Sequence, residues 1–160
     1  MKQILIFKTA APILALCVIL AGAMVATSPA KAESDPIYTE FLSNVALQGY
    51  DPVAYFKEQA AIKGNDNFST TYMGAEFYFA NAENLKDFKA NPPKYAPQYG
   101  GYCAWAMAQG NLAKGDAQFW RIVDGKLYLN YNQDVKDRWD KNIDGFIASA
   151  DKVWPDVLKK

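Results

Sequence analysis

Residues 118–130, QFWRIVDGKLYLN, constrain the fold of this chain more than any other segment. The central dipeptide, Asp124-Gly125, is typical of the type I′ turns that join two antiparallel strands through a two-residue loop. Such a turn sets the cross-strand pairs Ile122 with Leu127, Trp120 with Leu129, and Arg121 with Tyr128. Apolar residues dominate one face of this hairpin, so we expect it to be half-buried with that face against the core.

A second hairpin and several short helices are predicted around it. Residues 68–72 and 76–79 have strand composition on either side of Met73-Gly74-Ala75, and residues 53–56 resemble a further strand. Residues 63–67 are expected to form a polar loop. Helices are expected at residues 35–48, at 81–90 after the cap Asn81, from the cap Asn132 through Trp139, and from the cap Asp144 through Trp154. The sequence therefore predicts a small single α+β domain in which two antiparallel β-hairpins pack against several short helices.

Residues 1–32 have the pattern of an export signal. Two lysines accompany an apolar, uncharged run at residues 9–27, and Ala30-Lys31-Ala32 then supplies the small residues that signal peptidase requires. We expect cleavage after Ala32, which makes residues 33–160 a periplasmic or secreted domain. The alternative is a retained membrane anchor, because the apolar run is about long enough to span a bilayer.

Composition narrows the classes of partner. The whole chain has 17 basic residues, 17 acidic residues and no histidine, and removal of a signal with three lysines and no acid leaves a net charge of −3. No basic patch indicates a nucleic-acid partner. After processing we expect no stable membrane span. The mature chain is long enough for one compact core, and export places it in an oxidising compartment.

Cys103 is the only cysteine expected in the mature chain, and it lies in residues 98–110, QYGGYCAWAMAQG. The flanking glycines favour a short helix with Cys103 in its first turn, where the helix dipole stabilises a thiolate. Met107 then lies one turn away on the same face. The alternative is a strand, in which Cys103 and Met107 are about 13 Å apart and cannot share a metal ion.

Three roles are open for Cys103. A thiolate with a thioether suits Cu(I), so the first hypothesis is a soft-metal site of Cys103 and Met107, with Met73 as a third sulfur. In the second, Cys103 and Met107 simply pack in the protein interior. The third is a redox activity through a mixed disulfide or a sulfenic acid. Because the chain offers no histidine to activate a thiol nucleophile, we expect binding rather than catalysis.

Aromatic residues near this segment suggest a ligand pocket. The candidate lining residues are Tyr50, Asp51, Tyr99, Tyr102 and Trp105. With Cys103 packed in its wall, such a pocket would bind a small molecule or a partner protein. Alternatively, the tyrosine rings belong to the core, with their hydroxyl groups hydrogen-bonded at its edge.

Several of these segments resemble the YHS domain family. The resemblance is carried by GYDPVAYF at residues 49–56, by residues 72–79, and by residues 87–95. The later stretches YAPQYGGYCAWAMAQG and VDGKLYLNYN resemble the exported, single-domain branch of that family. The resemblance covers about residues 44–158 and implies the α+β fold expected above. It also implies an association with the binding, sensing and transport of heavy metals.

The chain departs from the family at the positions of the family's cysteines. By resemblance, these positions correspond to Ala54, Ala80 and Asn84, so all three thiols are missing. The family's metal ligands cannot be carried over onto them. The sequence leaves an exported binding protein, with Cu(I) at Cys103 or a non-metal ligand as the alternatives.

Overall fold

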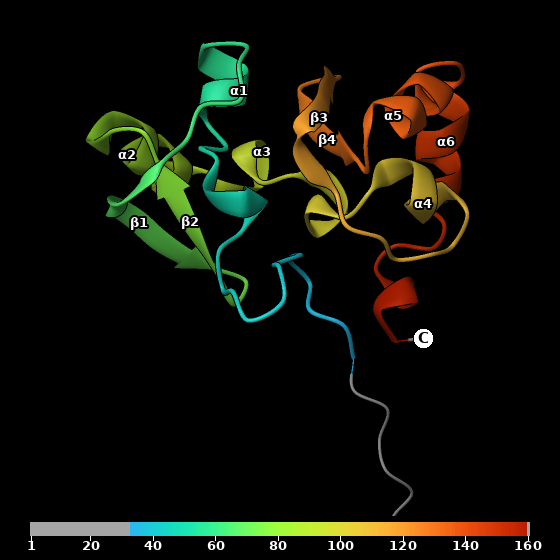
Figure 1. Ribbon diagram of the computed structural model, residues 1–160, viewed down its shortest axis with the longest axis horizontal. Helices are drawn as coiled ribbons and strands as arrows, with labels where there is room; N and C mark the ends of the chain where they lie inside the picture. The colour runs from blue at the N-terminus through green and yellow to red at the C-terminus, as the bar shows by residue number, and fades with distance from the viewer. Residues whose placement is uncertain (1–32, 160) are drawn as a thin grey trace, which may run out of the picture. The chain divides into compact units, whose positions relative to one another are not determined.

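The computed structural model describes residues 33–159 (Figure 1). The predicted signal peptide at residues 1–32 lies outside the described residues. The strands are β1 (Asn65–Tyr72), β2 (Ala75–Phe79), β3 (Asp116–Val123) and β4 (Lys126–Asn130). The helices are α1 (Ala54–Lys57), α2 (Ala82–Ala90), α3 (Pro92–Tyr95), α4 (Ala104–Ala108), α5 (Gln133–Trp139) and α6 (Ile143–Ala150). Three short 3₁₀ helices, η1 (Leu47–Gly49), η2 (Gln98–Gly101) and η3 (Asp156–Lys159), complete the described elements.

The two hairpins are the two sheets of an α+β fold, as the sequence predicts. Among the strands of residues 33–159, β1 pairs with β2 and β3 pairs with β4, in both cases antiparallel. The register of the β3–β4 hairpin is also confirmed: Trp120 lies opposite Leu129, Arg121 opposite Tyr128, and Ile122 opposite Leu127. Both turn residues, Asp124 and Gly125, have positive φ, as a type I′ turn requires.

The expectation that this hairpin is half-buried is wrong for β4, which is buried on both faces. Leu127 and Leu129 pack into a first apolar cluster with Phe77, Phe79 and Phe88. Tyr128, on the opposite face, packs into a second cluster with Tyr99, Met107 and Trp139. Figure 1 shows β4 with helices α4 and α5 beside it, and both helices contact the strand. β4 therefore separates two cores, each of which covers one of its faces.

The β1–β2 hairpin forms where it is predicted, but it is longer. Its turn lies at Met73 and Gly74, which have φ values of 48° and 88°. β1 begins at Asn65, so the predicted polar loop at residues 63–67 is partly strand. The pairing is irregular between Asn65 and Ser69, which is where the expected loop meets the expected strand.

The predicted helix at residues 35–48 is wrong. Thr39 pairs with Ala46 in an isolated antiparallel bridge, and the Ala46 N–H donates to the Glu76 carbonyl at 2.9 Å. Leu42 and Gln48 have left-handed φ values of 62° and 49°, which no α-helix accommodates. The apolar spacing that suggested a helix is misleading, because Phe41 in that stripe is 92% exposed.

The predicted strand at residues 53–56 is wrong as well, because α1 occupies this position. The Asp51 side chain caps the turn that leads into the helix: its Oδ1 accepts from the N–H groups of Val53 at 2.8 Å and Ala54 at 3.3 Å. An acidic cap followed by proline is a typical helix start, and here it outweighs the strand propensity of the residues that follow.

Helix caps were predicted with mixed success. Asn81 and Asn132 cap α2 and α5 as expected, each accepting a backbone N–H at 2.9 Å. The last helix is capped by Asn142, not Asp144, and it ends at Ala150 before Trp154. Within residues 33–159, no helix is both long and apolar enough to cross a membrane.

Candidate functional site

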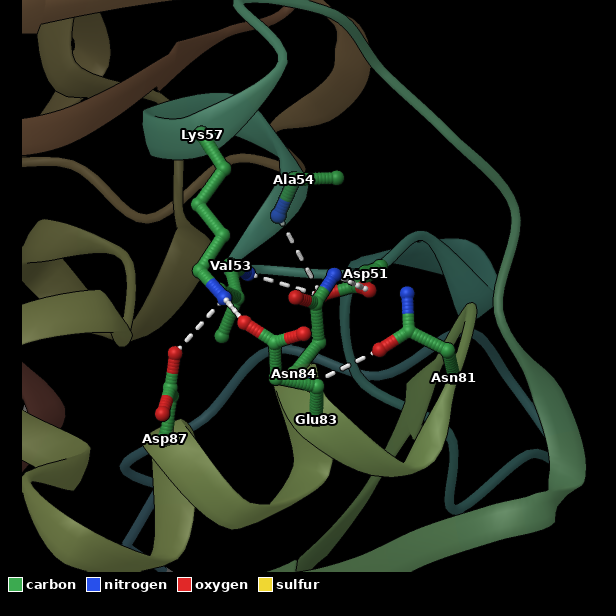
Figure 2. A network of polar contacts seen from close by, with 8 residues as sticks. All are labelled: Asp51, Val53, Ala54, Lys57, Asn81, Glu83, Asn84 and Asp87. Atoms are coloured by element: carbon green, nitrogen blue, oxygen red, sulfur yellow. Dashed lines mark hydrogen bonds and ion pairs between the residues drawn. The ribbon is translucent and has the colours of Figure 1, made fainter.

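Asp51 is fully buried, and its carboxylate accepts four hydrogen bonds. Figure 2 shows three of the donors, which are Val53 N–H, Ala54 N–H and the Asn84 side chain. Oδ2 accepts from the Ala80 N–H at 2.9 Å and from Asn84 Nδ2 at 2.7 Å. One carboxylate thus joins the start of α1, the end of β2 and the first turn of α2. Asp51 is a structural acceptor that is closed off from solvent. It therefore does not line a ligand pocket, contrary to the sequence prediction.

A surface ion pair lies beside this network. Lys57 Nζ is 2.7 Å from an Asp87 oxygen and 2.9 Å from a Glu83 oxygen (Figure 2). Its hydrogen bonds to Asp87 and Glu83 raise the pKa of Lys57, and the same contact lowers the pKa of Asp87. These ion pairs link α1 to α2 at the protein surface.

The helical alternative for the Cys103 segment is confirmed. α4 begins directly after Cys103, which is its N-cap, and the Met107 N–H donates to the Cys103 carbonyl at 2.9 Å. Cys103 and Met107 are therefore one helical turn apart. The strand alternative is wrong, although Cys103 forms one isolated parallel bridge with Leu129 of β4.

The Cys103 thiol lies in the protein interior. The residue is 1% exposed, and its Sγ donates a weak hydrogen bond to Asn130 Oδ1 at 3.8 Å. Burial raises the pKa of the thiol, and the backbone N–H groups of Ala106, Tyr131 and Trp105 oppose that effect only in part. The group is therefore a neutral thiol at neutral pH rather than the thiolate that binds metal ions and attacks disulfides.

The three candidate sulfurs do not share an accessible site. Met107 is fully buried in the second apolar cluster. Met73 lies in the β1–β2 turn and is 51% exposed. In the part of the chain that the structure describes, no group of three or more Cys, Asp or Glu side chains is arranged to hold a metal ion.

Three of the expected pocket residues belong to the core. The Tyr99 hydroxyl donates to Asp151 Oδ1 at 2.8 Å, and the Tyr102 hydroxyl donates to the Asp35 carbonyl at 2.9 Å. Both rings lie against Trp154, and Trp105 packs on the same cluster. This is the alternative in which the rings fill the core and hydrogen-bond at its edge.

Tyr50 is the expected pocket residue that lines an open cleft. This cleft has a volume of about 650 Å³. Its lining comes from four separate segments and includes Gln48, Tyr50, Lys63, Tyr78, Asp116 and Gln118. Sequence reasoning missed it because these residues are brought together by the irregular segment before α1, where a helix was expected.

The walls of the cleft are held by internal contacts. Lys63 Nζ lies 4.0 Å from the centre of the Tyr50 ring and donates to the Gln48 carbonyl. The Gln48 side chain accepts from the Ala117 N–H at 2.9 Å and donates to the Gly115 carbonyl at 3.2 Å. The cleft is therefore fixed to β3 on one side and to the residues before β1 on the other.

The backbone behind the cleft is packed without spare room. A Cβ atom at Gly64 would overlap the Tyr78 carbonyl, so only glycine fits there. The Gly64 N–H also donates to the Gly49 carbonyl at 2.9 Å. This close approach places the Tyr78 side chain in the wall of the cleft.

Comparison with known proteins identifies the central part of the chain. A family model described as YHS domain matches residues 53–99. This segment is a YHS domain. The match runs from the residue before α1 into η2 and confirms the resemblance seen in the sequence. No curated protein and no solved structure matches the chain significantly.

The metal binding associated with YHS domains does not fit Ala54, Ala80 and Asn84, the positions where the resemblance places the family's ligands. Ala54 and Ala80 provide no side-chain donor atom, and the Asn84 amide is committed to Asp51. All three residues donate instead to the Asp51 carboxylate, which fills this place with an internal polar contact. A soft metal ion would find no thiol at these three positions.

Proposed function

We propose that this protein is an exported binding module that holds a small molecule in the cleft beside Tyr50, with Cys103 as a structural thiol. The periplasmic or secreted location rests on the signal pattern of residues 1–32. The cleft volume of about 650 Å³ is typical of sites that bind small molecules. Aromatic side chains with a few polar groups, as in this lining, are also characteristic of such sites.

The observation that carries the proposal is that the cleft is built before any ligand arrives. Gln48 and Lys63 use hydrogen bonds to fix its walls, and Gly64 allows the backbone to close behind it. A site that is already ordered loses little conformational entropy on binding.

The proposal is tested by screening the exported protein against a small-molecule library, with the backbone amide signals read by NMR. We expect ligands to shift the amides of Gly49, Gly64 and Gln118. The variant Gln118→Trp, which fills the cleft, should abolish these shifts. The matched variant Gln109→Trp, at an exposed site after α4, should leave them intact. Ligands that shift only other regions would overturn the proposal.

Cu(I) at Cys103 and Met107 is the competing hypothesis, since α4 does place the two residues one turn apart. It is tested by titrating Cu(I) into the reduced protein in the presence of a competing chelator. With the thiol buried and neutral, we expect the native protein and Cys103→Ala to compete equally poorly. Stronger competition by the native protein alone would favour the metal site.

A further inference from the structure

Two polar side chains of the cleft lining, Gln48 and Lys63, make internal contacts. Both ends of the Gln48 amide are bound to the backbone at residues 115 and 117. Lys63 Nζ donates to the Gln48 carbonyl and faces the Tyr50 ring. These contacts shape the site, and they occupy both ends of the Gln48 amide.

Two carboxylates of the lining have oxygen atoms that are free to accept hydrogen bonds from a ligand. Glu40 and Asp116 line the cleft, and no side-chain hydrogen bond or ion pair of Glu40 occurs within residues 33–159. Asp116 Oδ1 accepts the Gln118 N–H at 2.9 Å, which leaves its second oxygen without a protein donor in the same range. Together with Lys63, the charged residues of the lining are two acids and one base. The cleft therefore carries a net negative charge and exposes unused acceptors.

The aromatic walls add a second preference. The Tyr50 ring already has an ammonium group 4.0 Å from its centre, which is well within cation–π distance. Tyr78 lines the same cleft, and Lys63 is the one cation of the lining. The cleft thus combines two aromatic rings with two carboxylates, and both kinds of group attract a hydrogen-bonding organic cation.

From these observations, and resting on the proposed function, we propose that the cleft binds a small organic cation that carries a primary ammonium or guanidinium group. The charged head hydrogen-bonds to the carboxylates of Glu40 and Asp116. The short apolar body of the ligand lies between the rings of Tyr50 and Tyr78.

The test compares probes of one shape and different charge on the exported protein: n-butylammonium, butyrate and 1-butanol. NMR titration should show saturable shifts at Gly49, Gly64 and Gln118 for n-butylammonium, with weak affinity because the probe is small. Butyrate should not bind, and 1-butanol should bind more weakly than the cation. Added salt should weaken the binding of the cation.

Variants in which one carboxylate is replaced by an amide show which acidic residues the cation contacts. Glu40→Gln and Asp116→Asn should each weaken n-butylammonium binding by about fivefold, as the loss of one partly exposed charge pair implies. Asp124→Asn, which removes the same charge from the β3–β4 turn, should leave the affinity unchanged. Equal losses in all three variants would reduce the effect to general electrostatics and would overturn the inference.

The outcomes separate this inference from the proposed function. If butyrate or 1-butanol binds the cleft as tightly as n-butylammonium, the cleft is a binding site, but its preference for cations is wrong. If no probe or library compound shifts the cleft amides, both proposals fail. Shifts from n-butylammonium that are confined to other surfaces also overturn the inference.

Discussion

At the scale of single residues, Asp51 connects more of the chain than any other polar group in Figure 2. Its four donors come from two helix starts and the end of a strand. A buried carboxylate with this many N–H partners is stable only while all of them are present, because each lost bond leaves a buried group without a partner. Asp51 therefore stabilises the junction of α1, β2 and α2.

We therefore expect Asp51→Asn to destabilise the protein by about 3 kcal/mol, since an amide replaces one acceptor by a donor that faces other donors. The measurement is the free energy of unfolding from urea titration. Asp66→Asn, in the exposed part of β1, is the matched control and should change that value by less than about 0.5 kcal/mol. Equal effects of the two substitutions would contradict the structural role of Asp51.

Cys103 leads to a second prediction at this scale. Because the thiol is buried and its pKa is raised, iodoacetamide should label it slowly in the native protein at neutral pH. Labelling should accelerate only at urea concentrations that unfold the chain, as measured by mass spectrometry of the peptide that contains Cys103. Fast labelling without urea would instead support the redox hypothesis.

At the scale of elements, local chemistry allowed the hairpins to be predicted, and long-range contacts explain the failures. Asp124-Gly125 fixed the register of β3 and β4 because a two-residue turn leaves one pairing. Residues 35–48 contain no comparable local signal. Their conformation is set by pairing with β2, through Val45 and Ala46 opposite Glu76, which lies 30 residues further along the chain.

The cleft could not be predicted for the same reason. Its wall depends on left-handed backbone at Gln48, and a residue of this type has no preference for that conformation. Lys63 and Asp116 are distant in the sequence from this irregular segment, and they line the cleft together with it. Tyr50 is the one residue of the expected pocket that lines this cleft. The Asp51 cap, by contrast, was visible in the Asp-Pro dipeptide and was missed.

Helix caps supply the element-scale prediction. Asn81→Ala should cost about 1 kcal/mol, because it removes the side-chain acceptor for the Asn84 N–H at the start of α2. Asn91→Ala is the control: Asn91 precedes α3, but its side chain makes no capping bond. We expect this control to change stability by less than about 0.5 kcal/mol. Thermal and urea unfolding should rank the two substitutions in this order.

At the scale of the whole molecule, the buried tyrosines should make the protein less stable as the pH becomes alkaline. Burial raises the pKa of several phenols, to about 12 for Tyr128 and further for Tyr55 and Tyr99. For Tyr99, the hydrogen bond to Asp151 raises the pKa in addition to burial. The folded state thus keeps these groups neutral at a pH where the unfolded chain, with an ordinary tyrosine pKa of 10.0, releases their protons. The Cys103 thiol acts in the same direction.

Because the folded pKa values are raised, their contribution to stability is complete below about pH 10 and declines as the pH rises through about 12. We expect the urea midpoint to fall between about pH 10 and about pH 12. Tyr128→Phe should reduce this fall with little effect at neutral pH, since the Tyr128 hydroxyl has no hydrogen-bond partner within residues 33–159. A midpoint that does not move with pH would show that the phenols ionise freely in the fold.

The position of β4 between the two apolar clusters has a consequence for how the molecule opens. Neither cluster can be exposed to water without removing a side chain of this strand from its partners, so local opening of one half disturbs the other. The amide protons of Leu127, Tyr128 and Leu129 should therefore exchange with deuterium only when the whole domain unfolds. The β1–β2 turn at Met73 should exchange through fast local fluctuations instead.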